Sequence, residues 1–368
     1  MDLQNFDHEQ VVIRRDDETG LVGIIALHST RLGPATGGCR RWRYVDLDAA
    51  KYDVLRLSEG MTLKNALAGI PFGGGKSVII ADNNQRPTAA QLQCFGTWLN
   101  DLQGRYITAE DVGMGVAEMR LIAAASPYVS GLGERGIGGD PSPKTAYGVF
   151  LGLKAAVQYK LGVTQLHGVR IGVQGLGSVG MVLCHWLARS GAEVWVTDLD
   201  ASRIALAEQK YGAVGVAPDQ LMQLEMDVFA PCAMGGIITE QIANELKAVV
   251  VAGAANNQLA TSACGDVLAA RGILYAPDFV INAGGVISVA HEYLMHQGMF
   301  ADKVDHSVER WVGGRIDSIA HRLVDILQIA EDEGCSTESV ARRKAFAVIN
   351  RPSVERDAER DVKTAVAA

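Results

Sequence analysis

The sequence lacks the features that would place the protein in a membrane, on a nucleic acid or in a secretory pathway. No apolar run approaches the roughly 20 residues that a membrane-spanning helix needs. Lys and Arg number 34 against 42 Asp and Glu, and the formal net charge of −8 argues against a nucleic-acid surface. Residues 1–7 are acidic and contain no apolar segment, so we expect no secretory signal. These absences predict a cytoplasmic protein.

Metal and disulfide frameworks are also missing. The 6 cysteines, at positions 39, 94, 184, 232, 264 and 335, include no pair at CxxC spacing. We therefore expect reduced, mostly buried thiols and no metal site. No internal repeat or low-complexity tract is present. With 368 residues, of which 48% are apolar and 21% charged, the chain suits a globular protein with two domains.

Short strands, helices and glycine-rich turns alternate over the first part of the chain. Apolar runs on either side of a turn at 18–20 predict two strands, at 11–13 and 21–27. The next expected elements are a loop at 31–40, a helix at 47–66, a strand at 77–81, a helix at 88–103 and a strand at 105–108. The Gly- and Pro-rich stretch 131–143 is typical of a linker, after which a helix from Thr145 leads to the next domain.

From Val169 onward the pattern changes to the alternation of strand and helix that is typical of a doubly wound parallel sheet. The expected elements are strands at 169–173, 193–197, 227–230, 248–252 and 273–275, and a helix at 178–190. Helical spacing predicts one apolar face formed by Ile316, Ile319, Ala320, Leu323, Leu327 and Ala330. The charged tail after Arg351 is expected to fray.

Two lysines in the first part of the chain are the strongest candidates for chemistry. Lys64 lies near the end of a helical apolar pattern, and Lys76 follows three glycines and leads into the strand expected at 77–81. Desolvation disfavours the charged form of a buried lysine. One such lysine can bind a carboxylate while its neighbour acts as an acid or base near neutral pH.

The segment around Lys76 is not a P-loop. Ile70 stands where that motif requires glycine, and the segment precedes a strand rather than opening a helix. Glu110 and Asp111 are candidate acidic partners for the lysines, and the alternative for them is an acidic loop without chemistry.

A glycine motif over residues 175–180 predicts a dinucleotide site, because it follows a strand and opens a helix. Gly175 permits the tight turn, Gly177 lets the backbone approach a pyrophosphate, and Gly180 lets the helix pack on the strand. Asp198 follows near the usual spacing of about 20 residues, where it can bind a ribose hydroxyl and repel a 2′-phosphate. NAD is therefore expected rather than NADP. A nicotinamide cofactor together with lysine chemistry suggests hydride transfer on an amino acid.

Three further polar segments lie in the second part of the chain, at 230–236, 252–258 and 282–286. The first two follow expected strands, and ligands of open α/β sheets bind at the carboxyl ends of strands. The alternative for the asparagines in these segments is simple turn formation.

From about residue 10 to 345, the chain resembles the amino acid dehydrogenase family, which includes leucine, valine and phenylalanine dehydrogenases and is related to glutamate dehydrogenase. The resemblance rests on ordered motifs at 33–38, 61–64, 73–76, 108–113, 175–180, 255–258 and 275–286. It implies an α/β fold in which an N-terminal substrate domain (1–144) and a doubly wound Rossmann NAD-binding domain (145–330) flank a cleft. A C-terminal segment (331–368) would return to the first domain.

The resemblance also implies NAD-dependent oxidative deamination of an L-amino acid to a 2-oxo acid and ammonia. Lys64 would bind the substrate carboxylate, Lys76 would activate water, and Asp111 would bind the amino group and shuttle protons. The implied substrate contacts are Thr36, Gly37, Gly38, Met61, Lys64, Ala109, Asn256, Val286 and Val289. The implied cofactor contacts are Thr145, Gly175, Gly177, Ser178, Val179, Gly180, Asp198, Cys232, Ala233, Ala254, Asn256 and Asn282. A homo-oligomer, from dimer to octamer, is expected.

Three positions depart from the leucine enzymes, and they bear on which amino acid is the substrate. Thr36 stands where those enzymes usually carry Leu, Lys144 replaces a neutral residue, and His291 replaces an acidic one. Val286 and Val289 match branched-chain enzymes, so leucine- or valine-like substrates are favoured. An aromatic substrate such as phenylalanine is the alternative within the family. A catalytically silent NAD-binding sensor is the alternative of another class.

Overall fold

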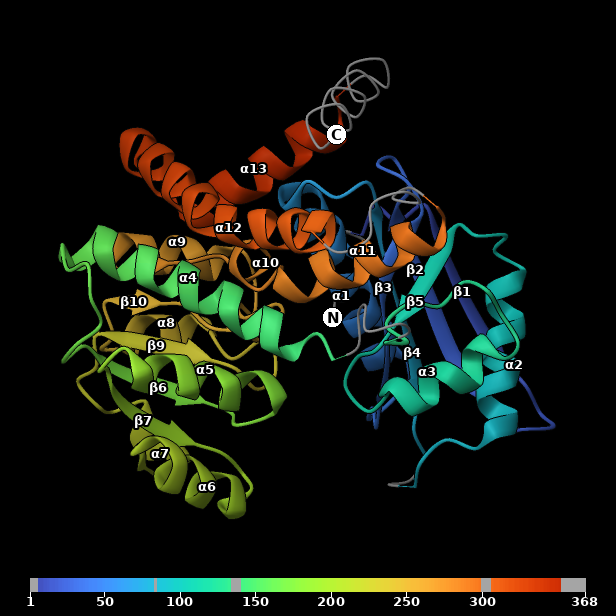
Figure 1. Cartoon of the computed structure of the whole chain (residues 1–368), viewed down its shortest axis with the longest axis horizontal. Helices are drawn as coiled ribbons and strands as arrows, with labels where there is room; N and C mark the ends of the chain where they lie inside the picture. Colours follow the sequence, from blue (N-terminus) through green and yellow to red (C-terminus); the bar gives the residue numbers. More distant parts are fainter. Residues whose placement is uncertain (1–5, 83–84, 134–139, 299–305, 352–368) are drawn as a thin grey trace. The chain divides into compact units, whose positions relative to one another are not determined.

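A computed structural model of the chain describes residues 6–82, 85–133, 140–298 and 306–351 (Figure 1). The chain forms two compact units. The first comprises residues 1–140, 289–312 and 344–368, and the second comprises 141–288 and 313–343. The predicted domain limits at 144 and 330, and the predicted cleft, stay predictions. Much of the linker expected at 131–143 and the tail expected after Arg351 lie outside the described residues.

The first unit is built on a mixed five-stranded sheet with the order β1-β2-β4-β3-β5. Its elements are β1 (Gln10–Arg15), β2 (Val22–Ser29), β3 (Ala35–Trp42), α1 (Leu47–Ala68), β4 (Gly73–Ile80), α2 (Ala89–Asn100), β5 (Tyr106–Ala109) and α3 (Val116–Ala123). β1 and β2 pair antiparallel, as do β2 and β4, whereas β3 pairs parallel with both β4 and β5. The predicted first hairpin and the predicted helix at 47–66 are confirmed.

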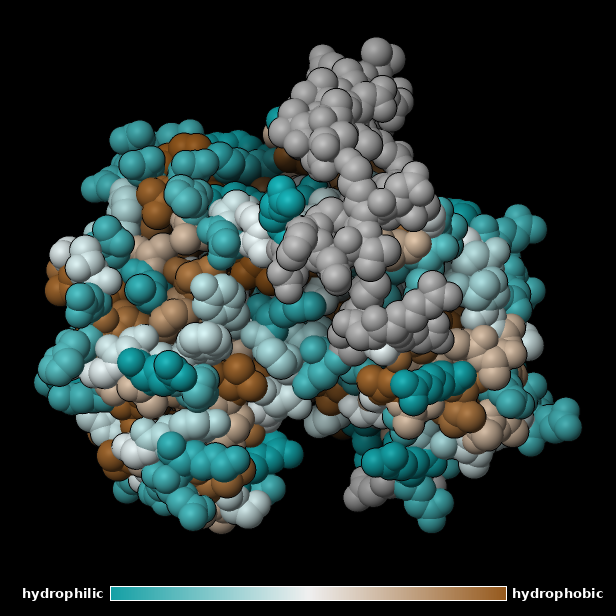
Figure 2. All heavy atoms as spheres, viewed as in Figure 1, coloured by the Kyte–Doolittle hydropathy of each residue, from teal (hydrophilic) through white to brown (hydrophobic). Residues whose placement is uncertain are grey.

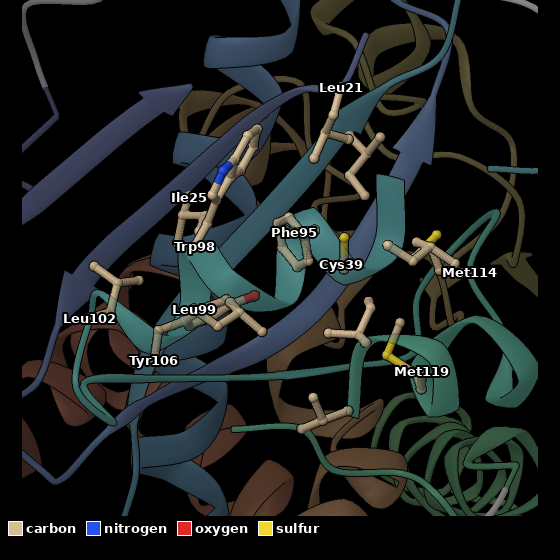
Figure 3. Close-up of a cluster of buried hydrophobic side chains, with 14 of the residues drawn as sticks. Leu21, Ile25, Cys39, Phe95, Trp98, Leu99, Leu102, Tyr106, Met114 and Met119 are labelled. Atoms are coloured by element: carbon tan, nitrogen blue, oxygen red, sulfur yellow. The ribbon is translucent and has the colours of Figure 1, made fainter. Parts of the chain in front are cut away.

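The two faces of this sheet carry separate apolar clusters, because successive side chains of a strand point to opposite sides. Ile25 of β2 belongs to a cluster that Phe95 and Trp98 of α2 cover (Figure 3). The neighbouring residue of β2, Ile24, packs on the other face with Val54 of α1. The sheet is therefore covered by α1 on one face and by α2 on the other.

The prediction of a loop at 31–40 was wrong. Residues 35–42 form β3, a central strand of the sheet, although glycine normally weakens strands. A Cβ atom on Gly37 would lie 1.8 Å from the carbonyl oxygen of Gly75. Glycine at this position therefore permits close contact with β4, which the sequence pattern alone did not reveal.

The predicted start of the next strand at residue 77 was also wrong, because β4 begins at Gly73 and includes Lys76. A Cβ on Gly73 would lie 1.9 Å from the carbonyl oxygen of Ser29, and one on Gly74 would lie 2.1 Å from the backbone nitrogen of Thr62. These glycines let β4 lie close to β2 and to the backbone of α1. The three glycines before Lys76 are therefore part of the strand and do not merely precede it.

The second unit contains a six-stranded parallel sheet with the order β11-β10-β9-β6-β7-β8 (Figure 1). Its elements are α4 (Ser142–Leu161), β6 (Arg170–Gln174), α5 (Ser178–Arg189), β7 (Glu193–Thr197), α6 (Ala201–Tyr211), β8 (Val214–Gly215), α7 (Pro218–Leu221), β9 (Val228–Pro231), α8 (Glu240–Glu245), β10 (Val250–Val251), α9 (Ala263–Ala270), β11 (Leu274–Tyr275) and α10 (Asp278–Ile281). From β6 the chain adds strands in one direction, and from β9 in the other. The predicted doubly wound sheet is confirmed.

Three helices are divided between the two units: α11 (Gly284–His296), α12 (His306–Glu333) and α13 (Thr337–Ile349). The predicted apolar face of α12 is confirmed. Its buried residues are Ile316, Ile319, Leu323, Leu327 and Ala330, and Ala320 is partly buried. The apolar run 279–281 belongs to the short helix α10, and Asn282 is the residue at which this helix ends.

The surfaces of both units mix hydrophobic and hydrophilic residues, as Figure 2 shows for one face. Such a mixture is ordinary for a globular protein, because there is too little polar surface to cover the molecule. None of the helices in the described part of the chain combines the length and the apolar character that crossing a membrane requires.

Candidate functional site

Two buried cationic side chains lie on the face of the first sheet that α1 covers. Lys76 lies two residues before Val78, which packs against α1, so both side chains are on the same side of β4. Arg40 lies on the neighbouring strand β3 and contacts Asp53 of α1. The pairing of two adjacent strands thus places two cations side by side beneath the helix.

Asp111, just after β5, pairs with both cations. Its Oδ1 lies 2.9 Å from Lys76 Nζ, and its Oδ2 accepts a hydrogen bond of 2.8 Å from Arg40 Nε. The exposed fraction is 4% for the Lys76 side chain, 7% for Arg40 and 12% for Asp111. Buried charges persist only when they are paired, and here each carboxylate oxygen has its own cationic partner.

The electrostatic environment keeps this carboxylate ionised. Burial by itself would raise the pKa of the Asp111 carboxyl, but the charges of Lys76 and Arg40 outweigh it and hold this pKa well below its ordinary range. Burial likewise acts to lower the pKa of Arg40, and Asp111 and Asp53 together raise it above its ordinary value. Asp111 is therefore a hydrogen-bond acceptor at neutral pH.

The network continues from Arg40 to the outside of the unit. Arg40 Nη1 donates to Asp53 Oδ2 at 3.0 Å, and the Tyr44 hydroxyl donates to the same oxygen at 2.7 Å. The Asp53 side chain is 30% exposed. Cations and anions thus alternate along the network, which runs from the buried Lys76 through Asp111 and Arg40 to the partly exposed Asp53. Its two positive and two negative charges cancel.

Glu110 stands in contrast to its neighbour Asp111. Burial, followed by the negative charges of Asp140, Glu292 and Glu118, raises the pKa of the Glu110 carboxyl to about 7. Two adjacent carboxyls therefore have pKa values displaced in opposite directions. Such a separation is more frequent at functional sites than elsewhere, although structural ion pairs also produce it.

Two glycines of β3 form the backbone wall beside this network. A Cβ on Gly38 would lie 2.3 Å from the carbonyl oxygen of Glu110 and 2.8 Å from Asp111 Cβ. A Cβ on Gly37 would also lie 3.2 Å from Met61 Cγ. Ala109 pairs with Gly38 across β3 and β5. The structure therefore brings together Gly37, Gly38, Met61, Ala109, Lys76 and Asp111.

Lys64 and Thr36 come from α1 and β3 of the same unit. Lys64 follows Met61 by one turn of α1, so the two share a face, and Lys64 is 7% exposed. The Thr36 hydroxyl accepts a 2.9 Å hydrogen bond from Asn65 Nδ2, which also donates to the carbonyl oxygen of Gly73. The side chain of Thr36, expected to contact substrate, is thus oriented by Asn65.

The glycine loop of the second unit combines close packing at two glycines with open space at the third. Gly175 has a φ of +98°, and a Cβ there would lie 2.7 Å from Ala233 Cβ. A Cβ on Gly180 would lie 2.0 Å from the carbonyl oxygen of Gly175, so helix and strand are in close contact. At Gly177, by contrast, an added Cβ would meet nothing within 4 Å. Close packing surrounds the loop, and open space lies at the glycine expected to approach a phosphate.

The loop continues into α5, which begins at Ser178 and Val179 and receives no side-chain cap from Gly177. The free N–H groups of such a helix start attract anions. The predicted cofactor residues Cys232 and Ala254 follow β9 and β10, the strands on the other side of β6. All of these positions lie at the carboxyl edge of the parallel sheet, where ligands of open α/β sheets bind.

Asp198, at the end of β7, is tied to the glycine loop. Its Oδ2 accepts a 2.6 Å hydrogen bond from Leu176 N, and its Oδ1 accepts one of 2.9 Å from Asp200 N. Arg203 Nη1 lies 3.8 Å from Asp198 Oδ2. This carboxylate therefore shapes the loop in addition to any contact that it makes with a ribose.

Asn256 and Asn282 lie side by side in the second unit. Asn282 Nδ2 donates to Asn256 Oδ1 at 3.2 Å and to the carbonyl oxygen of Ala254 at 3.1 Å.

Thr145 lies at the start of α4, where a Cβ on Gly285 would lie 2.4 Å from its hydroxyl oxygen. Lys144 Nζ donates to Ser288 Oγ at 2.7 Å. Val286 and Val289 lie one turn apart on α11, in different units.

Sequence reasoning missed Arg40, Asp53, Tyr44 and Asn65. Arg40 lies in the segment that was expected to be a loop, and the side chains of a loop do not alternate between two faces. Recognition of 35–42 as a strand would have placed Arg40 on the same side as Thr36, toward the helix. The sequence around Asp53 contains no pattern that predicts its ion pair with Arg40 of β3.

Two family models match the chain. A family model described as the Glu/Leu/Phe/Val dehydrogenase dimerisation domain matches residues 8–128. A second, described as Glutamate/Leucine/Phenylalanine/Valine dehydrogenase, matches residues 195–351.

Individual relatives cover most of the chain. A leucine dehydrogenase from Geobacillus stearothermophilus is 44% identical over 93% of this chain and 91% of its own length. A valine dehydrogenase from Streptomyces virginiae is 45% identical over 77% of this chain and 81% of its own. The crystal structure of L-tryptophan dehydrogenase from Nostoc punctiforme matches with a TM-score of 0.74 and 40% identity, covering 94% of this chain and 96% of that one.

Proposed function

The chain belongs to the glutamate, leucine, phenylalanine and valine dehydrogenase family and is an amino acid dehydrogenase; we propose that it carries out NAD-dependent oxidative deamination of an apolar L-amino acid. The products are the 2-oxo acid and ammonia, and the reaction is reversible. Branched-chain substrates of the leucine and valine type are favoured. The observation that carries the proposal is the buried Lys76–Asp111 pair beside the glycine wall of β3.

The residues of the first unit take the following roles in this proposal. Lys64 binds the substrate carboxylate, with the backbone at Gly37 and Gly38 beside it. Lys76 activates the attacking water and exchanges protons with the carbinolamine. Asp111 accepts a hydrogen bond from the substrate amino group, a role that its low pKa supports. Asp111 can shuttle a proton only when the charge of a cationic partner changes.

The residues of the second unit fit a nicotinamide dinucleotide. The open space at Gly177 and the uncapped start of α5 suit a pyrophosphate. Asp198 suits a ribose hydroxyl. When bound, the nicotinamide would accept a hydride from the substrate Cα. Thr145, Asn256 and Asn282 are the residues proposed to lie near its ring.

The preference for NAD is expected to depend on the charge of Asp198. Asp198→Ala should narrow the gap between NAD and NADP in kcat/KM, because the repulsion of a 2′-phosphate is lost. Asp198→Asn is the sharper variant, since its amide oxygen still accepts from Leu176 N while the charge is gone. Both variants should shift in the same direction. A wild-type protein that already prefers NADP would contradict this role.

The proposed function is tested by a panel of amino acids and both dinucleotides, with absorbance of the reduced nicotinamide as the signal. Turnover highest with leucine, isoleucine or valine supports the favoured substrates. The relative named L-tryptophan dehydrogenase makes the aromatic amino acids an essential part of the panel. Dinucleotide binding with no turnover on any amino acid would instead indicate a catalytically silent sensor.

We also propose that the protein is a homo-oligomer, from dimer to octamer. The match of residues 8–128 to a model described as a dimerisation domain supports this assembly. Light scattering on the purified protein measures its mass directly, and a mass near the 39.2 kDa of one chain would contradict the proposal.

A further inference from the structure

We propose that Arg40 is a positioning residue for the reaction, which fixes the Asp111 carboxylate against Lys76 while Asp53 balances its charge. The inference rests on the proposed function, because the roles of Lys76 and Asp111 are part of it. Arg40 does not itself act on the substrate in this proposal. It acts through the carboxylate that it holds.

The geometry of the guanidinium carries the first part of the argument. Arg40 uses two different nitrogens for two partners: Nε donates to Asp111 at 2.8 Å, and Nη1 donates to Asp53 at 3.0 Å. A planar guanidinium holds both hydrogen bonds in one fixed arrangement, which the single ammonium group of a lysine cannot do. Because Lys76 takes the other oxygen of Asp111, the carboxylate is held at two points and its rotation is restricted.

The burial of Asp111 is the second part of the argument. At 12% exposure, the Asp111 side chain has little access to solvent, and its ionised form depends on protein cations. When both cations are present and one of them loses its proton or its charge, the other still pairs with the Asp111 carboxylate. Without Arg40, the ionisation of Asp111 would depend on Lys76 alone, the residue proposed to exchange protons during the reaction.

The charges that face Asp111 come from several elements. Lys76 faces it from β4 and Arg40 from β3, and both lower its pKa. Three further groups have an electrostatic interaction with Asp111: Cys39 on β3, Tyr44 beyond the end of β3, and Tyr106 on β5. Asp53 acts on the carboxylate through Arg40, whose positive charge it offsets. Arg40 and Asp53 should therefore have opposite effects on the protonation of Asp111.

The test compares Arg40→Gln, Arg40→Lys and Asp53→Asn with wild type by the pH profile of kcat/KM for the preferred amino acid. The acidic limb of this profile reports essential groups of the free enzyme. Removal of the Arg40 charge should move that limb to higher pH by about one unit or more, the effect expected of one close opposite charge. Arg40→Lys should restore part of the shift. Asp53→Asn should leave the limb in place or move it to lower pH.

The alternative outcomes are separable. If Arg40→Gln lowers kcat/KM equally at every pH, the residue is only part of the scaffold and the inference is wrong. The inference would also be overturned if Asp53→Asn moved the acidic limb to higher pH, as Arg40→Gln is expected to do. If Arg40→Gln fails to fold, the other two variants still decide the question, because Arg40→Lys should move the acidic limb to higher pH and Asp53→Asn should not.

A failure of the proposed function has a different signature. In that case wild type would be inactive with every amino acid, and no profile could be recorded. The protonation of Asp111 can then be followed by NMR on protein labelled with carbon-13 aspartate, with Asp111→Asn used to assign the resonance. An upward shift of its titration in Arg40→Lys supports the inference without any turnover, and an unchanged titration overturns it.

Discussion

Replacement of Lys76 with alanine is expected to lower turnover by about two to four orders of magnitude, the usual contribution of a positioned acid or base. The ammonium group of Lys76 lies 2.9 Å from Oδ1 of Asp111, and alanine removes both the charge and the proton carrier. Asp111 keeps its 2.8 Å hydrogen bond from Arg40, so the buried carboxylate is not left without a cation. The fold should therefore persist, and the second unit should still bind NAD.

The measurement combines steady-state turnover with NAD binding, so that loss of chemistry is separated from loss of fold. Lys51→Ala is the matched control, because Lys51 lies on α1 of the same unit and is half-buried outside the ion-pair network. Its turnover should stay close to that of wild type. Near-wild-type turnover in Lys76→Ala would refute the proposed role of Lys76.

Replacement of Lys64 with serine is expected to raise KM for the amino acid by about ten- to a hundredfold. A charge-assisted hydrogen bond contributes about 1.5–3 kcal/mol, and each 1.4 kcal/mol corresponds to a tenfold change. Lys64 is only 7% exposed, so water compensates poorly for the lost contact. If the carboxylate also positions Cα for hydride transfer, kcat should fall together with the rise in KM.

The substrate itself supplies a second test of Lys64. Isobutylamine has the side chain of valine but no carboxylate, so it cannot make the charge-assisted hydrogen bond proposed for Lys64. Wild type should therefore oxidise isobutylamine far more slowly than valine. Comparable rates with the two compounds would mean that Lys64 does not anchor a carboxylate, and the assignment of an amino acid substrate would lose its support.

The parts of the fold that the sequence predicted well are those with a local periodic signal. β1 and β2 are apolar runs on either side of a turn, and α12 repeats its apolar residues at helical spacing. The parallel sheet of the second unit was recognised from its regular alternation of strands and helices. In each case the buried face is encoded within a few consecutive residues, so neighbours in space add little to the signal.

The errors in the fold have one physical cause. Gly37 was assigned to a loop, and Gly73 to Gly75 were placed before the next strand rather than in it, because glycine tolerates conformations that other residues avoid. In the structure they are strand residues. At Gly37, Gly73 and Gly74 another backbone lies where a Cβ would be, and at Gly75 the ring of Tyr106 lies there. The 1.8 Å approach of Gly75 O to a Cβ on Gly37 depends on the neighbouring strand, about which the local sequence carries no information.

The candidate site divides in the same way. By itself the sequence determined the chemical inventory: Lys64, Lys76 and Asp111 as groups for acid–base chemistry, and a glycine loop followed by Asp198 for a dinucleotide. Those signals are local motifs whose residue types and spacing carry their meaning. Only the tertiary structure decided which charges meet. The pairing of β3 with β4 and β5 brings Arg40, Lys76 and Asp111 together from three separate segments, and α1 adds Asp53. Because the ionisation of a buried carboxylate depends on the cations within a few ångströms, the state of Asp111 follows from that packing and not from its own sequence motif.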